Sequence, residues 1–327
     1  MDQFFLQLTP KQAQPSINYN TSIFLMGSCF VENIGKKLAY HKFQNTINPF
    51  GIIFHPKAIQ SLLQRIVKQH FFTEKDVFFH NEQWHCFEVH SELSNPNKEQ
   101  FLTVLNNQLK ISLEQLKQAS HVVLTFGTAW GYSHKENNQT VANCHKVPQQ
   151  QFDKQLMTVL GLEKCFLNCF ELIGQLNSKA QIITTISPVR HIKDGVSENN
   201  RSKSNLLAGL HQSIENTSNT SYYPAYELMM DCLRDYRFYE ADLIHPNQIA
   251  IDFIWKHFMQ TWIHETTTQQ TIKRISEIQR GLLHRPFNSE SEGHQKFLKK
   301  LNEKIEKLTI EFPVSYTHLT LPTNREV

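Results

Sequence analysis

A serine, an aspartate and a histidine have the types and the settings that nucleophilic catalysis needs. Ser28 follows a short apolar run and precedes a helical pattern, while Asp242 and His245 stand in one loop before another helical pattern. A serine hydroxyl attacks an ester only when a base removes its proton, and a histidine base needs a carboxylate to hold its tautomer. These three residues could therefore carry out acyl transfer or ester hydrolysis.

Each part of this set also has a plain structural explanation. A serine between a strand and a helix is usually an N-cap, and Asp-x-x-His is common in surface turns that cap a following helix. At a helix N-terminus, however, Ser28 would lie beside backbone N–H groups that can stabilise an oxyanion. The three residues together indicate a catalytic triad more strongly than any of them does alone.

Three apolar runs, rich in Ile, Val, Leu and Thr, must position these residues. They predict buried parallel strands at 22–26, 121–126 and 181–186. Helical patterns alternate with them, and strand–helix alternation is typical of a three-layer α/β/α fold with a parallel sheet. The predicted helices cover 31–41, 101–118, 152–176, 203–214 and 248–258.

The carboxyl ends of the predicted strands mark where a ligand should bind. In an open parallel sheet, ligands gather outside these ends. The residues that follow the three strands there are Ser28, Gly127, Arg190 and His191. We expect the site to lie among them, with Arg190 able to bind an anionic or hydroxyl-rich substrate.

Two segments depart from the α/β pattern. Aromatic-rich stretches around Asn81-Glu82-Gln83 predict a β-hairpin at about 76–90, inserted into the α/β frame and able to cover the site. After His264 the chain becomes charged and helical, over 267–281 and 290–309. We therefore expect a catalytic domain over 1–265 and a helical extension over 266–313.

The last residues, 314–327, are set apart from the predicted fold. The run from Val314 to Thr323 resembles the translation of a transposase adapter used in sequencing, and it follows the charged helical pattern abruptly. We expect this segment to be a non-native tail. The alternative is a native, irregular tail.

Several short motifs resemble one protein family. Gly27-Ser28-Cys29-Phe30 is similar to the signature of the GSCFA family, which is similar to the SGNH/GDSL hydrolases, and the resemblance spans about residues 22–258. Asp242 to Asn247 is similar to the last block of that superfamily. Four more segments resemble the family: Asn48-Pro49-Phe50-Gly51, Phe126-Gly127-Thr128-Ala129-Trp130, Ala142-Asn143-Cys144-His145-Lys146 and Ser187-Pro188-Val189-Arg190-His191.

This resemblance implies a flavodoxin-like fold and a Ser–His–Asp triad with a three-donor oxyanion hole. Ser28 would be the nucleophile, His245 the base and Asp242 its orienter. The backbone N–H groups of Ser28 and Gly51 would be two of the oxyanion donors. The substrate would be an ester of a small or carbohydrate-like alcohol, and no cofactor would be needed.

The third block departs from the superfamily pattern. An asparagine usually stands two residues after its glycine, but here Gly127 is followed by Thr128 and Ala129. The amide of Asn143 could donate in place of the missing asparagine, or Asn143 could hold a turn. His145 and His191 also stand near expected strand ends, as second-rank candidates for the site.

Other classes of function fit the sequence less well. Cys29 adjoins Ser28 and Cys144 adjoins His145, so a cysteine hydrolase is an alternative, although Cys29 should be buried and inert. A zinc hydrolase would require His145, His191 and His245 to converge without a local metal motif. A non-catalytic binding module on the same fold is the third alternative, suggested by the altered third block.

The amino-acid composition indicates which classes of binding partner and which cellular compartment to expect. The 327 residues carry a net charge of +3 with scattered Lys and Arg, so we expect no nucleic-acid partner. There is no apolar segment of about 20 residues and no signal peptide pattern, so we expect no membrane partner. Six cysteines without a regular spacing suit a cytoplasmic protein. The oligomeric state stays open.

Overall fold

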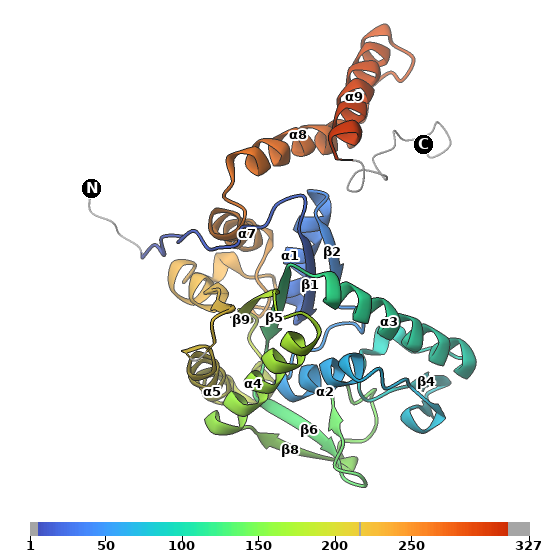
Figure 1. The fold of residues 1–327 in the computed structure, drawn as a ribbon, viewed down its shortest axis with the longest axis vertical. Coiled ribbons are helices and arrows are strands. Elements are labelled where there is room, and N and C mark those ends of the chain that lie inside the picture. Colours follow the sequence, from blue (N-terminus) through green and yellow to red (C-terminus); the bar gives the residue numbers. More distant parts are fainter. Residues whose placement is uncertain (1–5, 216, 313–327) are drawn as a thin grey trace.

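A five-stranded parallel sheet lies at the centre of the computed structural model, which describes residues 6–215 and 217–312 (Figure 1). The strands are arranged in the order β10-β9-β5-β1-β2, and every neighbouring pair is parallel. Their bounds are β1 Ser22–Gly27, β2 Gln44–Ile47, β5 His121–Phe126, β9 Gln181–Ile186 and β10 Thr220–Tyr222.

The three central strands are the three that the apolar runs predicted. All residues of β5 and β9 are buried, as expected of strands covered on both faces. The edge strands β2 and β10 were not predicted, because they are short and contain polar residues that remain partly exposed.

Alternate residues of each central strand enter two separate cores, which makes the fold three-layered. Phe24 and Met26 of β1 pack in a core with α2 to α5, whereas Ile23 and Leu25 pack in a core with α1 and α7. The predicted α/β/α sandwich is therefore confirmed. These helices are α1 Cys29–Tyr40, α2 Pro56–Val67, α3 Lys98–Gln118, α4 Val159–Leu176, α5 Val196–Glu215 and α7 Gln248–Trp262.

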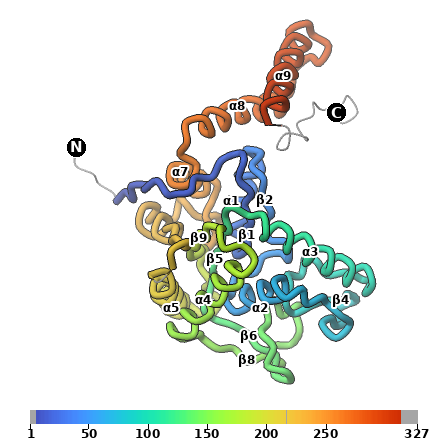
Figure 2. The backbone as a smooth tube through the Cα atoms, in the orientation of Figure 1, coloured from blue at the N-terminus to red at the C-terminus, as the bar shows by residue number. Residues whose placement is uncertain are grey.

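The predicted helical C-terminal region consists of α8 (Thr266–Leu282) and α9 (Glu292–Glu311). Gln279 of α8 donates to the carbonyl of Tyr40, 3.2 Å away, at the end of α1, and Phe312 contacts Tyr19, just before β1. Both contacts lie at the amino ends of the strands, and Figure 2 shows these helices at the far end of the molecule from β6 and β8. The predicted tail, 314–327, lies outside the described residues.

The predicted hairpin is formed by β3 (Phe78–His80) and β4 (Gln83–His85). Its two turn residues, Asn81 and Glu82, have φ of 44° and 61°. Positive φ at both positions is the geometry of a two-residue hairpin turn whose twist matches that of the strands.

A second antiparallel sheet was not predicted. It has the order β7-β6-β8, with β6 at Trp130–His134, β7 at Thr140–Val141 and β8 at Phe152–Leu156. The predicted helix over 152–176 is wrong for its first residues, because β8 alternates between buried and exposed side chains and pairs with β6. The helix α4 begins only after its N-cap, Thr158.

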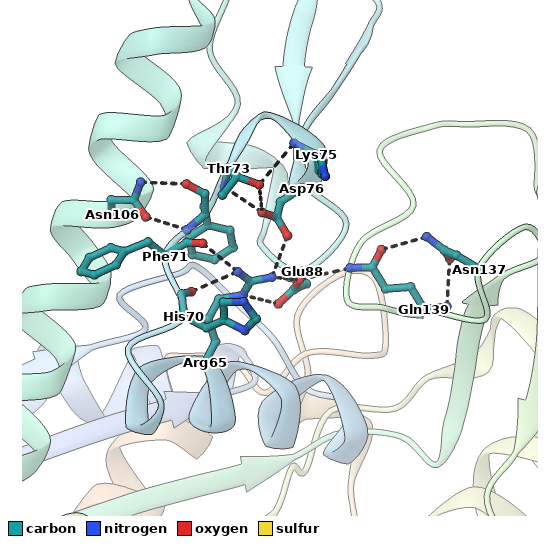
Figure 3. Close-up of polar contacts among 11 residues, drawn as sticks. Arg65, His70, Phe71, Thr73, Lys75, Asp76, Glu88, Asn106, Asn137 and Gln139 are labelled. Atoms are coloured by element: carbon teal, nitrogen blue, oxygen red, sulfur yellow. Dashed lines mark hydrogen bonds and ion pairs between the residues drawn. The ribbon is translucent and has the colours of Figure 1, made fainter.

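A half-buried ion-pair network anchors the hairpin segment to α2 (Figure 3). Arg65 of α2 donates to Glu88 at 2.9 Å through Nε and to Asp76 at 2.9 Å through Nη2. Gln139 also donates to Glu88, at 3.1 Å, from the loop between β6 and β7. This network fixes the chain that runs from β4 past Gly51 toward α3.

The remaining helical segments are short. They are the α-helical turn Ala225–Glu227, the π-helix Leu228–Cys232, and 3₁₀ turns at Glu74–Asp76, Ser91–Leu93, Gln149–Gln151, Ile192–Asp194 and Tyr236–Phe238.

Candidate active site

Ser28 lies at the junction of β1 and α1. It follows Gly27, the last residue of β1, where no larger residue would fit. A Cβ on Gly27 would lie 2.4 Å from the carbonyl oxygen of Thr125 on β5. Ser28 is 2% exposed, and its Oγ accepts the N–H of Phe30 at 3.3 Å, so the hydroxyl is the N-cap of α1. The backbone N–H of Ser28 donates to Thr125, with a distance of 3.2 Å.

Asp242 and His245 form a hydrogen-bonded pair in the loop before α7. The Nδ1 atom of His245 lies 2.7 Å from Oδ2 of Asp242. The other carboxylate oxygen, Oδ1, accepts the backbone N–H groups of Ile244 at 2.9 Å and His245 at 3.0 Å. The N–H of His245, its side chain and the N–H of Ile244 together lower the pKa of Asp242 to about 2. The carboxylate is thus ionised and fixed, and among the described residues no hydrogen bond engages Nε2 of His245.

The loop that bears His245 adjoins the first turn of α1. Phe30 and Asn33 of α1 line a small cavity together with Pro188 and with Pro246, the residue after His245. Within residues 6–215 and 217–312, no hydrogen bond joins Ser28 to His245. Catalytic hydrogen bonds are often long in a free enzyme and tighten only when substrate binds.

Lys203 of α5 is a site residue that sequence reasoning missed. It is 2% exposed, and its Nζ donates to the carbonyl oxygens of Gly127 and Ser187, each at 2.7 Å. Burial lowers the pKa of Lys203 to about 7. The signal in the sequence was its position three and seven residues before Leu206 and Leu210, which places a lysine on the buried face of a helix.

The segment from Gly127 to Ala129 is hydrogen-bonded to α5. The hydroxyl of Thr128 lies 3.0 Å from that of Ser202, and Ser202 also accepts the N–H of Ala129 at 2.7 Å. A Cβ on Gly127 would lie 2.8 Å from Nε2 of His191. The hydroxyl of Thr128 is therefore hydrogen-bonded to α5, and the imidazole of His191 fills the space beside Gly127.

His191 presents a buried nitrogen at this strand end. Within the described chain, its Nε2 has no hydrogen-bond partner, and its ring packs on Phe54 with centroids 4.9 Å apart. Burial, followed by the charges of Lys203 and His245, lowers the pKa of His191 to about 3. The imidazole is therefore neutral at physiological pH.

Gly51 and Asn48 form a turn against the end of β1. Gly51 has a φ of 77°, its N–H donates to the carbonyl of Asn48 at 2.8 Å, and a Cβ there would lie 2.3 Å from that of His90. The side-chain oxygen of Asn48 accepts the N–H of Gly27 at 2.8 Å. The Nδ2 of Asn48 is buried and unpartnered among the described residues, which makes Asn48 a further candidate donor that the sequence did not single out.

Asn143 and His145 lie in a turn after β7. The side-chain oxygen of Asn143 accepts the N–H of His145 at 2.9 Å, while its Nδ2 is 3.5 Å from Oγ of Ser91. His145 is buried, and its Nε2 lies 2.7 Å from the carbonyl oxygen of Cys86. The oxygen of Asn143 thus holds the turn, and His145 joins it to the end of the hairpin segment.

The cysteines beside these residues are not poised as nucleophiles. Cys29 is partly exposed, so the expectation that it would be buried is wrong, because the helix begins at Cys29 while Ser28 is the more enclosed of the two. Burial, and next the charge of Glu32, raise the pKa of Cys29, and burial raises that of Cys144. Both thiols are therefore protonated at neutral pH.

The part of the chain that the structure describes contains no set of side chains arranged to bind a metal ion. No three His, Cys, Asp or Glu side chains are grouped there so as to hold a metal ion. His145, His191 and His245 do not form such a set.

Two models of protein families match this sequence. The model described as the GSCFA family matches residues 22–258, which include Ser28, Asp242 and His245. The chain belongs to the GSCFA family. A second model, described as the C-terminal domain of GSCFA domain proteins, matches residues 275–316 of this GSCFA protein, a range that includes the last part of α8 and all of α9.

Comparisons with curated proteins and with solved structures give little information beyond the family assignment. A search of curated proteins found no match. Among solved structures, an acetyl xylan esterase (Est2A) from the rumen bacterium Butyrivibrio proteoclasticus is similar, with a TM-score of 0.40 and 10% identity. The similarity covers 76% of this chain and 64% of that chain. In the described residues, no helix is both long and apolar enough to cross a membrane.

Proposed function

We propose that this GSCFA protein is a serine hydrolase that cleaves or transfers an ester-linked acyl group. The observation that carries this proposal is the 2.7 Å contact between Asp242 and His245, which holds one histidine nitrogen and frees the other. Ser28 supports it from the end of β1, next to the loop that bears His245.

In the proposed reaction, His245 takes the proton of the Ser28 hydroxyl as Oγ attacks the ester carbonyl. The carbonyl oxygen becomes an oxyanion, and the tetrahedral intermediate breaks down as His245 protonates the leaving alcohol. Water or a second alcohol then attacks the acyl-serine while His245 takes its proton, and His245 returns this proton to Oγ of Ser28 as the free acid or the new ester leaves. Asp242 stabilises the imidazolium in both steps.

The oxyanion would be bound by donors around the end of β1. Our assignment comprises the N–H groups of Ser28 and Gly51 and one side-chain amide. Asn143 is the candidate from the sequence, and Asn48 is the alternative that its buried, unpartnered Nδ2 favours. The N–H groups of Ser28 and Gly51 bond to backbone carbonyls here, so they would have to turn or share their hydrogens in the transition state.

A fluorophosphonate probe followed by peptide mass spectrometry tests the proposal. We expect label on Ser28, its loss in the Ser28→Ala and His245→Ala variants, and its retention in Cys29→Ala as the matched control. Hydrolysis of p-nitrophenyl acetate should follow the same order. Label on Cys29, or undiminished label in the His245 variant, contradicts the triad.

A binding module without catalysis is the second candidate. The enclosure of Ser28 and its role as N-cap favour this alternative. A folded wild-type protein with neither label nor hydrolysis would establish it over the esterase.

A further inference from the structure

An open cavity of about 240 Å³ lies beside the loop that bears His245. Its lining includes Arg190, from the segment after β9, together with Arg234, Tyr236 and Tyr239. Tyr239 is joined to Pro246 by a β-bridge, and the N–H of Glu240 donates to the carbonyl of His245 at 2.8 Å. The cavity wall is therefore continuous with the catalytic loop of the proposed triad.

Two arginines of this cavity, Arg190 and Arg234, form no ion pair with any carboxylate of the described residues. In the described part of the chain, the arginines with ion pairs are Arg65, Arg201, Arg237 and Arg274. Arg190 and Arg234 are not among them. Asp235 also lines the cavity, but its side chain accepts the N–H of Arg237 at 2.9 Å.

Aromatic rings hold one of these charges in place. The guanidinium of Arg190 lies 4.8 Å from the ring centroid of Tyr239 and 5.8 Å from that of Tyr236. The side chain of Arg190 also hydrogen-bonds to Tyr239. Cation–π contacts orient a guanidinium, and its remaining N–H groups can bind an anion in a forked geometry. The lining also contains Met229 and Met230 from the π-helix. A π-helix is a rare conformation that often occurs at functional sites.

We infer that this cavity binds an acidic group, such as a carboxylate, on the alcohol portion of the ester. The inference rests on the proposed function, because His245 protonates the leaving oxygen and the leaving alcohol must therefore lie on its side. Arg190 and Arg234 would bind the anion, while Tyr236 and Tyr239 would pack against the carbon skeleton. The preferred substrate is then an acylated hydroxy acid or acidic sugar.

A matched pair of esters tests this inference. The wild-type protein should hydrolyse 3-acetoxybenzoate with a higher kcat/KM than 3-acetoxybenzamide, in which a neutral amide of similar size replaces the carboxylate. The ratio of the two values should fall about 10-fold or more in Arg190→Gln and in Arg234→Gln, as expected for a lost charge-assisted hydrogen bond. Arg201→Gln is the control, since Arg201 is exposed and neither it nor its ion-pair partner Glu198 lines the cavity. An unchanged ratio in Arg190→Gln overturns the inference.

A binding measurement separates this inference from the triad. Calorimetry with 3-hydroxybenzoate and 3-hydroxybenzamide reports on the cavity even if neither ester is hydrolysed. Binding of the acid, its absence for the amide and its loss in Arg190→Gln support the cavity, whatever the fate of Ser28. Equal binding of acid and amide overturns it. The Arg234 variant keeps the test valid if Arg190→Gln fails to fold.

Discussion

The Nζ atom of Lys203 lies 2.7 Å from the carbonyl oxygen of Gly127, in the third block of the site. The same amine holds the carbonyl of Ser187, so one side chain of α5 ties the ends of β5 and β9 together. Because no carboxylate within the described residues bonds to this amine, its charge is costly in the folded state.

This cost gives the stability of the protein a pH dependence. The folded pKa of Lys203 is about 7, whereas the usual value is 10.5, so between these values the unfolded chain binds a proton that the folded chain does not. The free energy of unfolding of wild type, relative to Lys203→Met, should therefore rise from about pH 7 toward pH 10 and stay flat at lower pH. Urea denaturation of both proteins across this range measures the difference, and a difference independent of pH contradicts it.

Asp242→Asn should retain the fold and lose most of the activity. The amide favours the wrong tautomer of His245, an effect worth about 10⁴-fold in a serine protease triad. Stability should barely change, because both side chains are about half exposed. Since the pKa of Asp242 is about 2, its titration should not affect wild-type activity near neutral pH. Ester hydrolysis and thermal melting of the variant test this prediction, and wild-type turnover would contradict it.

Gly127→Ala should destabilise the protein by displacing His191. The new Cβ would lie 2.8 Å from Nε2 of His191 and 2.9 Å from Cβ of Phe54, and overpacking of this kind costs about 1–3 kcal/mol. Adding His191→Ala should recover part of the loss in urea denaturation. Gly174→Ala is the matched control, because nothing lies within 4 Å of its added Cβ, and it should not destabilise. No recovery in the double variant would show that Phe54 alone causes the strain.

Asn143 can be tested as a donor separately from its role in the turn. Its oxygen accepts the N–H of His145, and Asn143→Asp keeps that acceptor while it removes the donor. If Asn143 is an oxyanion donor, Asn143→Asp and Asn143→Ala should both lower kcat by about 10²–10³-fold with little change in KM. If only the turn matters, the aspartate should restore kcat. Asn48→Asp, which keeps the acceptor for Gly27, is the parallel test of Asn48.

The sequence predicted the central strands and the helices whose apolar residues follow a clear pattern. The strands β1, β5 and β9 were visible because their apolar runs are continuous, and α1 and α7 because their periodicity begins after capping residues, Ser28 and Asn247. β8 was missed because its alternation merges with the helical pattern of α4. Short edge strands such as β2 and β10 form because they pair with a neighbouring strand, and this pairing is not evident from their amino-acid composition.

The candidate site was predictable only where it is local. Asp242 and His245 are three residues apart, so their contact follows from one loop. Lys203 and Gly127 are 76 residues apart, and their hydrogen bond depends on how α5 packs across the sheet. The grouping of Arg190 with Arg234 and Tyr236 likewise arises from a fold-dependent approach of two loops.

The placement of α8 and α9 at the amino ends of the strands has a practical consequence. The helices α8 and α9 pack near Tyr40 and Tyr19, at the opposite end of the strands from Ser28 and His245. A linker, bead or fusion partner attached to the exposed face of α9 would therefore point away from the candidate active site. Tethering through α9 should hold the molecule on a surface with its reactive end toward the solution.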